Sequence, residues 1–257
     1  MDSQLQQLQR HARVLALRSP SNLRVGPFVC RFNPDWPSPY ANYAIPDDGS
    51  EPTPTDVRAL ISVFEENGRR PRLEFLPVCA PAVEGALLAA GFEVEDRASV
   101  MLCPPGELVV PTGVPDLDFA EPRGDDELHA LAVVQHRAFG EPDEPAKDAG
   151  DRLRRTYRNG GIVVLARLAG EPVAGGACSA PVDGMTEVTG VAVAEAFRAR
   201  GIGAALSARL TALAHARGYH LPWLEPADKA VERVYARIGY RPIGEKLSIS
   251  LPQDASD

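Results

Sequence analysis

The sequence has few cysteines, no long apolar run and no excess of basic residues, and each absence excludes a class of protein. Its four cysteines stand singly, without the Cys-x-x-Cys spacing of a zinc ribbon or redox pair, so we expect reduced thiols in a cytoplasmic protein. No apolar run reaches the ~18 residues of a membrane span. The N-terminus lacks the basic and apolar regions of a secretion signal. The formal net charge of −8 speaks against nucleic acid as a general partner. The histidines show no metal-ligand spacing, so no metal site is predicted.

The 257 residues, 44% of them hydrophobic, suffice for one large domain or two of ordinary size. Proline and glycine concentrate in 104–115, which we take as a linker between domains over 1–103 and 116–257. Three consecutive strands joined by glycine-containing turns within 162–193 predict an antiparallel meander. Because helical segments alternate with strands elsewhere, the predicted fold class is α/β, a mixed and mostly antiparallel sheet flanked by helices.

The segment from Arg198 to Ala205 combines two arginines with two glycines, between an apolar strand at 188–193 and a helix. The first turn of a helix carries unpaired N–H groups and the positive end of the peptide dipoles. Glycine lets a diphosphate approach the backbone, and arginine adds a permanent charge. This order therefore predicts an anion site. No Gly-Lys-Ser/Thr follows, which excludes a P-loop, and the third glycine of a dinucleotide fingerprint is missing. A plain strand-to-helix turn remains the alternative.

An internal repeat relates the two halves of the chain. Val83-Glu84 matches Val231-Glu232, and Gly91-Phe92 matches Gly239-Tyr240 at the same interval. Both copies read helix, glycine, strand, helix, glycine with an aromatic residue, and strand. Several matches in register favour two related domains over coincidence.

Two motifs in order resemble the GCN5-related N-acetyltransferase (GNAT) family. They are the Arg-x-x-Gly-x-Gly loop at 198–203 and the block Tyr235-Ala236-Arg237-Ile238-Gly239-Tyr240. The resemblance covers most of 116–250 and implies a sheet splayed between the loop strand and the next strand, with the pantetheine arm of acetyl-CoA in the gap. Residues 1–103 resemble the second half of the same fold in degenerate form, so we expect two GNAT-like domains.

The resemblance also implies the residues of the cofactor site. Val191 and Val193 would offer main-chain groups to pantetheine. The residues implied around the pyrophosphate are Arg198, Arg200, Gly201, Ile202, Gly203 and Ala204. Asp228 stands where the family often has asparagine, which puts one cofactor hydrogen bond in doubt. Gly190, inside a strand, is typical of a bulge or a close backbone approach, although a flexible core strand would also account for it.

Acetyl transfer to an amine needs a base, because a substrate ammonium has a pKa near 10. Glu187 is the candidate base, on a strand where alternation would place Glu187, Thr189, Val191 and Val193 on one face. An exposed strand-end glutamate is the alternative reading. Tyr235 is the candidate acid for the leaving thiolate, since a phenol is a donor at neutral pH. A core tyrosine on an amphipathic helix is the alternative.

The predicted function is an N-acetyltransferase that transfers acetyl directly from acetyl-CoA to an amine, releasing CoA. A catalytically inactive CoA-binding or sensing module and an acyltransferase for a longer acyl-CoA remain open. The acceptor is not readable from the sequence. The acidic loop 141–144 would attract a cationic amine or be simply solvated. A homodimer is one open oligomeric state. The N-terminal copy has Leu87 in place of the tyrosine and acidic residues at 47–51, whose charge would repel a pyrophosphate.

Overall fold

The computed structural model describes residues 2–34, 36–141, 145 and 149–252, and within them the chain forms two compact units. The first unit comprises the residues up to Val100 together with those from Ile243 onward. The second unit comprises Met101–Pro242. Among the helices of the described ranges, none has the length and apolar character needed to cross a bilayer.

The first unit is an antiparallel hairpin extended by further strands and covered by helices. Strands β1, β2 and β3 pair antiparallel, β3 runs parallel to β4, and β4 pairs antiparallel with β11. Its elements are α1 (Asp2–Leu17), β1 (Ser21–Val25), β2 (Phe28–Phe32), a 3-10 turn (Pro39–Ala41), β3 (Tyr43–Pro46), α2 (Pro54–Glu66), β4 (Arg72–Phe75), α3 (Pro81–Ala89), the start of β5 (Glu93–Leu102) and most of β11 (Arg241–Ser250). Phe28, Phe64, Leu73 and Leu87 are fully buried in the core that α2 and α3 share with the strands.

The second unit contains the loop and most of the motifs that the sequence singled out. Its elements are the end of β5, β6 (Leu117–Ala120), α4 (Asp125–Ala138), α5 (Ala149–Arg158), β7 (Ile162–Leu168), β8 (Glu171–Cys178), β9 (Met185–Val193), a 3-10 turn (Glu195–Phe197), α6 (Ile202–Ala216), β10 (Leu221–Leu224), α7 (Lys229–Arg237) and the start of β11. Strands β6 to β9 form an antiparallel meander, β9 and β10 are parallel, and β10 is antiparallel to the end of β5. The predicted mixed, mostly antiparallel sheet is confirmed.

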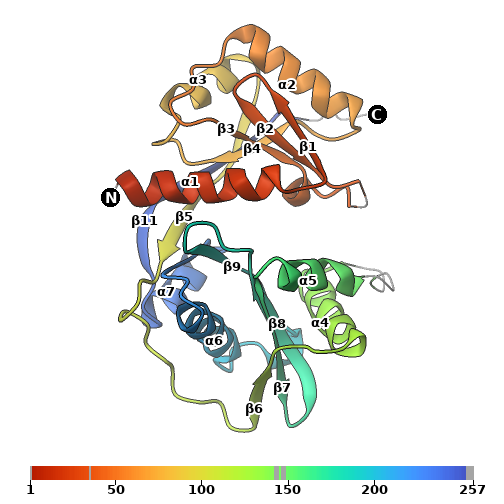
Figure 1. Cartoon of the computed structure of the whole chain (residues 1–257), viewed down its shortest axis with the longest axis vertical. Helices are drawn as coiled ribbons and strands as arrows, with labels where there is room; N and C mark the ends of the chain where they lie inside the picture. The colour runs from red at the N-terminus through yellow and green to blue at the C-terminus, as the bar shows by residue number, and fades with distance from the viewer. Residues whose placement is uncertain (1, 35, 142–144, 146–148, 253–257) are drawn as a thin grey trace. The chain divides into compact units, whose positions relative to one another are not determined.

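Helices cover both faces of this sheet, and two consecutive glycines of β8 mark the faces (Figure 1). A Cβ added at Gly175 would collide with the side chain of Leu131 on α4. A Cβ at Gly176 would come within 2.9 Å of the side chain of Leu210 on α6. Because neighbouring residues of a strand point to opposite faces, α4 lies on one face and α6 on the other.

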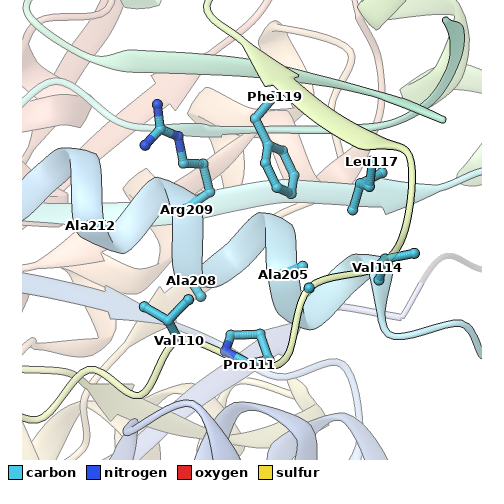
Figure 2. A pocket seen from close by; sticks show the side chains of 10 residues that line it. Val110, Pro111, Val114, Leu117, Phe119, Ala205, Ala208, Arg209 and Ala212 are labelled. Atoms are coloured by element: carbon cyan, nitrogen blue, oxygen red, sulfur yellow. The ribbon is translucent and has the colours of Figure 1, made fainter. Parts of the chain in front are cut away.

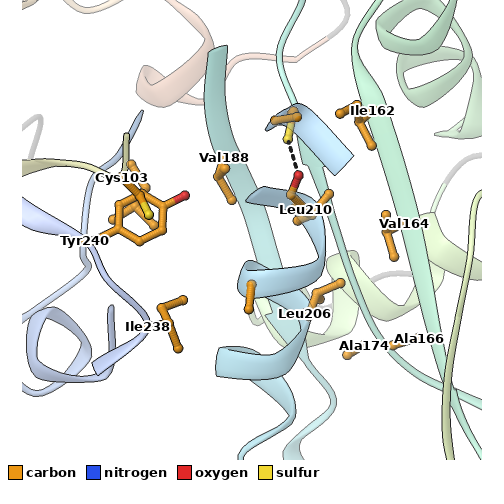
Figure 3. Close-up of a cluster of buried hydrophobic side chains, with 14 of the residues drawn as sticks. Cys103, Ile162, Val164, Ala166, Ala174, Val188, Leu206, Leu210, Ile238 and Tyr240 are labelled. Carbon is orange, nitrogen blue, oxygen red and sulfur yellow. Dashed lines mark hydrogen bonds between the residues drawn. The ribbon is translucent and has the colours of Figure 1, made fainter. Parts of the chain in front are cut away.

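The main core of the second unit lies under α6. Figure 3 shows Leu206 and Leu210 of α6 directed at Ile162, Val164 and Val188 of the meander. The buried Tyr240 hydroxyl lies 2.6 Å from the Thr211 hydroxyl on α6, which satisfies both groups. This packing fixes α6, and therefore its N-terminus, relative to the strands of the meander.

The repeat seen in the sequence is also a repeat of structural elements. Helices α3 and α7 have matching bounds at the interval that separates Val83 from Val231. Strands β5 and β11 match in the same way, and the first residues of α2 and α6, Pro54 and Ile202, are separated by this interval too.

The structure differs from the predicted boundaries near both ends of the second unit. After Gly91 and Gly239 the chain forms β5 and β11, each a single strand of ten residues. Each of them begins in one unit and ends in the other. Residues from Ile243 onward therefore lie with the first unit, not with 116–242 as predicted. The Pro/Gly-rich composition of 104–115 signalled a break in secondary structure, but it did not report which unit each flanking strand joins.

Candidate functional site

Strands β9 and β10 separate after a short parallel pairing. The paired residues end at Glu187 and Trp223, whereas β9 continues to Val193. The other edge of β9 stays paired with β8 as far as Val193. One edge of β9 therefore has no strand partner beyond Glu187 in the described part of the chain, and the splaying that the resemblance implies stays a prediction.

A β-bulge lies on the open part of β9. Gly175 pairs with Ala192 and Ala177 pairs with Thr189, so two residues of β9 face the single Gly176. Gly190 has a φ of +62° there, in the left-handed region that favours glycine. Its carbonyl oxygen accepts a hydrogen bond of 2.7 Å from the Gln135 side chain on α4. The bulge expected at Gly190 is confirmed.

The bulge changes which residues of β9 share a face. Thr189 pairs with Ala177 and lies on the α4 face, whereas Val193 pairs with Ala174 and lies on the α6 face. The prediction that Glu187, Thr189, Val191 and Val193 share one face is therefore wrong. The extra residue at the bulge reverses the alternation, so the valines pack under α6 while Glu187 and Thr189 stay on the other face.

The main-chain groups of Val191 and Val193 lie on the open edge. Ala194 donates its N–H to the Val173 oxygen on β8 at 2.8 Å. Main-chain groups of successive residues point to opposite edges of a strand, so those of Val193 and Val191 face away from β8. The Val193 oxygen on this edge already accepts from Arg198, which leaves the Val193 N–H and the Val191 groups placed toward a ligand, and contact with pantetheine stays a prediction.

The loop after β9 ends in a helix start with open amide groups. Ala199 and Gly201 both have positive φ, and Gly201 is the N-cap of α6 without a side-chain cap. The first intrahelical bond joins the Ala205 N–H to the Gly201 oxygen at 3.0 Å. The N–H groups of Ile202, Gly203 and Ala204 have no acceptor within the helix, which is the arrangement that suits an anion; binding of one here stays a prediction.

The fold alone does not require a glycine at position 203. Its φ is not in the left-handed region, and an added Cβ would meet the Val193 side chain at 3.6 Å, an ordinary contact distance. The small residue thus fits a ligand that approaches the backbone.

The two arginines brace the loop. Arg198 donates to the Val193 oxygen at 3.2 Å and to the Ala138 oxygen at 2.9 Å. Arg200 donates to the Ala196 oxygen at 3.1 Å and stacks on the Phe197 ring at 5.2 Å. Both side chains are exposed and bond only to uncharged carbonyl oxygens in these contacts. Their positive charges therefore add to the positive potential at the start of α6.

Glu187 lies where β9 and β10 separate. It is half-buried, and its main chain is held by Ser179, whose Oγ accepts from the Glu187 N–H at 2.9 Å. Its side chain lies on the α4 face, as the pairing of its neighbours requires. This is a suitable place for a base acting on an acceptor from that face, a role that stays a prediction.

Tyr235 lies on α7 against α6, on the opposite face. Its ring is 6.0 Å from that of Tyr240, and burial raises the pKa of the phenol, an effect that the nearby Ser207 hydroxyl opposes. The phenol therefore stays protonated at neutral pH, as a proton donor must. The core packing against Tyr240 also fits the alternative reading, so the catalytic role stays a prediction.

Asp228 caps a helix. It is the N-cap of α7, and its Oδ1 accepts from the N–H groups of Ala230 at 2.7 Å and Val231 at 2.8 Å. This local role accounts for an aspartate at the position. The predicted cofactor contact of Asp228 has no separate support.

An apolar pocket of about 230 Å³ lies on another flank of α6 (Figure 2). Its walls are apolar residues of 110–114, Leu117 and Phe119 of β6, and the alanines of α6, with Arg209 at its rim. None of the predicted cofactor residues lines it. The predicted site is instead an open edge and a helix start. The acidic loop 141–144 lies outside the described residues except for Glu141.

Sequence reasoning missed Gln135. Its side chain is 4% exposed on α4, between apolar neighbours that pack on the sheet. The sequence does place this glutamine on the apolar stripe of an amphipathic helix. Such a position indicates a buried amide with specific hydrogen-bond partners.

The second unit thus combines a mixed sheet with a strand–loop–helix turn whose first amide groups are open, next to the unpaired edge of β9. Residues 126–240 match the model of the acetyltransferase (GNAT) family. The matched segment includes both the Arg198 loop and the Tyr235 block, on which the resemblance was drawn.

Solved structures extend the likeness over nearly the whole chain. A GCN5-related N-acetyltransferase from Kribbella flavida is 25% identical, with a TM-score of 0.80, 97% of this chain covered and 96% of that one. One from Sphaerobacter thermophilus is 14% identical, with a TM-score of 0.69 and coverage of 97% and 90%. A tandem GNAT protein from the clavulanic acid biosynthesis pathway is 13% identical, with a TM-score of 0.61 and coverage of 93% and 86%. No match was found among curated proteins.

Proposed function

We propose that this protein is an acetyl-CoA-dependent N-acetyltransferase whose reaction takes place in the second unit. The observation that carries the proposal is the open amide turn at Gly201–Ala204 directly after the open edge of β9, within the segment that matches the family. The helix start would hold the pyrophosphate, and the edge at Val191 and Val193 would hold the pantetheine arm.

In this mechanism Glu187 takes a proton from the acceptor ammonium, through water where the distance requires it. The neutral amine attacks the thioester carbonyl carbon, forming the C–N bond and a tetrahedral oxyanion. Collapse of the oxyanion breaks the C–S bond, and the Tyr235 phenol protonates the departing thiolate. The new amide nitrogen then loses its extra proton to water, and the Tyr235 phenolate takes a proton back from water. The products are an N-acetyl amine and free CoA, and no covalent enzyme intermediate forms.

We further propose that the first unit is a degenerate copy that binds no CoA. The shared bounds of the repeated elements support a tandem origin. In the loop before α2, Asp47 and Asp48 form ion pairs with Arg24 and Arg13, and the positions equivalent to Arg198 and Arg200 are Ser50 and Pro52. Carboxylates at this position oppose a pyrophosphate.

Calorimetry with acetyl-CoA tests the site. We expect one molecule bound per chain, and loss of binding in Gly203→Glu, because the added carboxylate would cover the helix start. Gly85→Glu is the matched control, since Gly85 is exposed on α3 with no atom within 4 Å of an added Cβ. Absence of binding to the wild-type protein at high micromolar acetyl-CoA would refute the proposal.

Turnover separates an enzyme from a sensing module. Thiol release is followed with a panel of small amines, aminoglycosides, amino acids and lysine peptides, using acetyl-CoA and succinyl-CoA as donors. Binding of acetyl-CoA without thiol release for any acceptor would favour the binding module, and faster release from the longer donor would redefine the acyl group.

A further inference from the structure

Gln135 connects two helices to the bulge of β9. Its Nε2 donates to the Gly190 oxygen at 2.7 Å, and its Oε1 accepts from Arg152 Nη2 on α5 at 3.2 Å. The side chain is buried, so both bonds are made in a low-dielectric surrounding. A Cβ at Gly190 would come within 2.7 Å of the Gln135 amide nitrogen, so the glycine is also required for this approach.

The bond to Gly190 orients the next amide group as well. The Gly190 C=O and the Val191 N–H belong to one planar peptide unit, and in a trans peptide they point in opposite directions. Holding the carbonyl toward α4 therefore directs the Val191 N–H away from α4. Without this bond the peptide unit of a glycine bulge has alternative orientations available.

The same bond makes the Val191 N–H a stronger donor. Hydrogen bonds in a chain polarise one another, by about 10–30% per bond. Here the chain runs from the Arg152 guanidinium through the Gln135 amide to the peptide unit of Gly190 and Val191. The donor at its end, the Val191 N–H, points away from α4 on the stretch of β9 to which the proposed function assigns the pantetheine arm.

We propose that Gln135, held by Arg152, is a positioning residue that aims and polarises the Val191 N–H toward the acyl carbonyl oxygen of the thioester. This inference rests on the proposed function. Stabilisation of a developing oxyanion raises kcat more than ground-state affinity, because the charge appears only in the transition state.

Gln135→Glu is the sharpest test, because it preserves shape and the acceptor for Arg152 but removes the donor at neutral pH. Loss of one oxyanion donor costs about 10²–10³ in kcat, and a misaimed donor costs less. We expect kcat to fall by about 10- to 100-fold, with KM for acetyl-CoA changed less than about threefold. Gln135→Met, which has neither donor nor acceptor, should behave similarly.

Gln9→Glu is the matched control. Gln9 is also buried, accepts from the Leu76 N–H at 2.8 Å and donates to Asp48 at 2.9 Å, in the first unit. Its substitution removes a comparable buried donor and should lower stability while leaving kcat unchanged. If the Gln135 variants do not fold, Arg152→Met serves in their place, with a smaller fall in kcat expected at unchanged KM.

A nuclear magnetic resonance experiment tests the orientation without any substrate. In ¹⁵N-labelled protein the Val191 amide proton should move upfield in Gln135→Glu and not in Gln9→Glu. Unchanged kcat and an unmoved Val191 resonance in an active, folded variant would overturn this inference alone. A wild-type protein that neither binds nor consumes acetyl-CoA would overturn the proposed function and this role together.

Discussion

Thr53 and Gly201 are the N-cap residues of the equivalent helices α2 and α6, and they leave the first amide groups of these helices in opposite states. The Thr53 hydroxyl accepts from the Asp56 N–H at 3.2 Å, and the Asp56 carboxylate accepts from the Thr53 N–H at 2.8 Å. Pro54 removes a further donor. Gly201 offers no side chain to its helix. The start of α2 is thus closed by its own residues, whereas the start of α6 is open to a ligand.

Thr53→Ala should destabilise the first unit without affecting the cofactor. Loss of the cap leaves a helix amide unsatisfied and costs about 1 kcal/mol. Urea unfolding should show this loss, while calorimetry gives an unchanged Kd for acetyl-CoA. A weakened Kd would contradict the assignment of binding to α6 alone.

Glu187→Gln and Tyr235→Phe should lower the rate of transfer and spare cofactor binding. A positioned acid or base contributes about 10²- to 10⁴-fold, so each variant should lose rate in this range. Thiol release gives the rate and calorimetry the affinity. If both variants retain the wild-type rate in an active enzyme, the two role assignments are wrong.

The stability of the first unit should fall in acid because of Glu74. Burial by itself would raise the pKa of this carboxyl, but the charges of Lys246 and Arg72 outweigh it and lower the pKa to about 2. A lowered pKa contributes stability above the ordinary value of 4.5, and this contribution is lost as the pH falls toward 2. The difference corresponds to at most about 3 kcal/mol.

Urea unfolding between pH 7 and pH 3 checks this expectation. Glu74→Gln should be less stable than the wild type at pH 7, because Arg72 and Lys246 both lose the charge of this carboxylate, and the difference should shrink in acid. Glu66→Gln, at an exposed position at the end of α2, is the control and should follow the wild type. A difference that does not depend on pH would contradict the ionised state of Glu74.

Fragments should fold according to the observed units and not to the predicted boundaries. A fragment over 116–257 lacks the fully buried Met101 and the pairing of Leu102 with Trp223. It also carries Leu247 and Ile249 without the β4 partners that bury them in the first unit. We expect it to aggregate, and a fragment over 101–242 to be the better folded by circular dichroism and gel filtration. The opposite ranking would refute the division at Ile243.

Local patterns accounted for the loop and the order of the elements. The apolar strand, the glycines and the following helix at 188–216 are contiguous, so a strand–loop–helix anion site could be read without knowing any distant contact. The bulge at Gly190 could also be predicted locally, because the backbone freedom of glycine is a property of the residue itself.

The sequence did not indicate how the bulge changes the faces on which the residues of β9 lie. Strict alternation placed Val191 and Val193 beside Glu187, and only the pairing with β8 shows that the alternation reverses. The role of Gln135 depends on α4 crossing β9 at Gly190, 55 residues away in the chain. The observed units differ from the predicted domain boundaries because β5 and β11 each pair with strands that the composition of 104–115 does not indicate.

The sequence by itself determined the class of fold, the repeated order of helices and strands, and a helix start suited to an anion, because these follow from the periodicity and backbone freedom of neighbouring residues. Only the tertiary structure decided which edge of β9 is open, which faces Glu187 and Tyr235 occupy, and that Gln135 holds the Gly190 carbonyl. These depend on strand register and helix packing between distant segments, which no local pattern encodes.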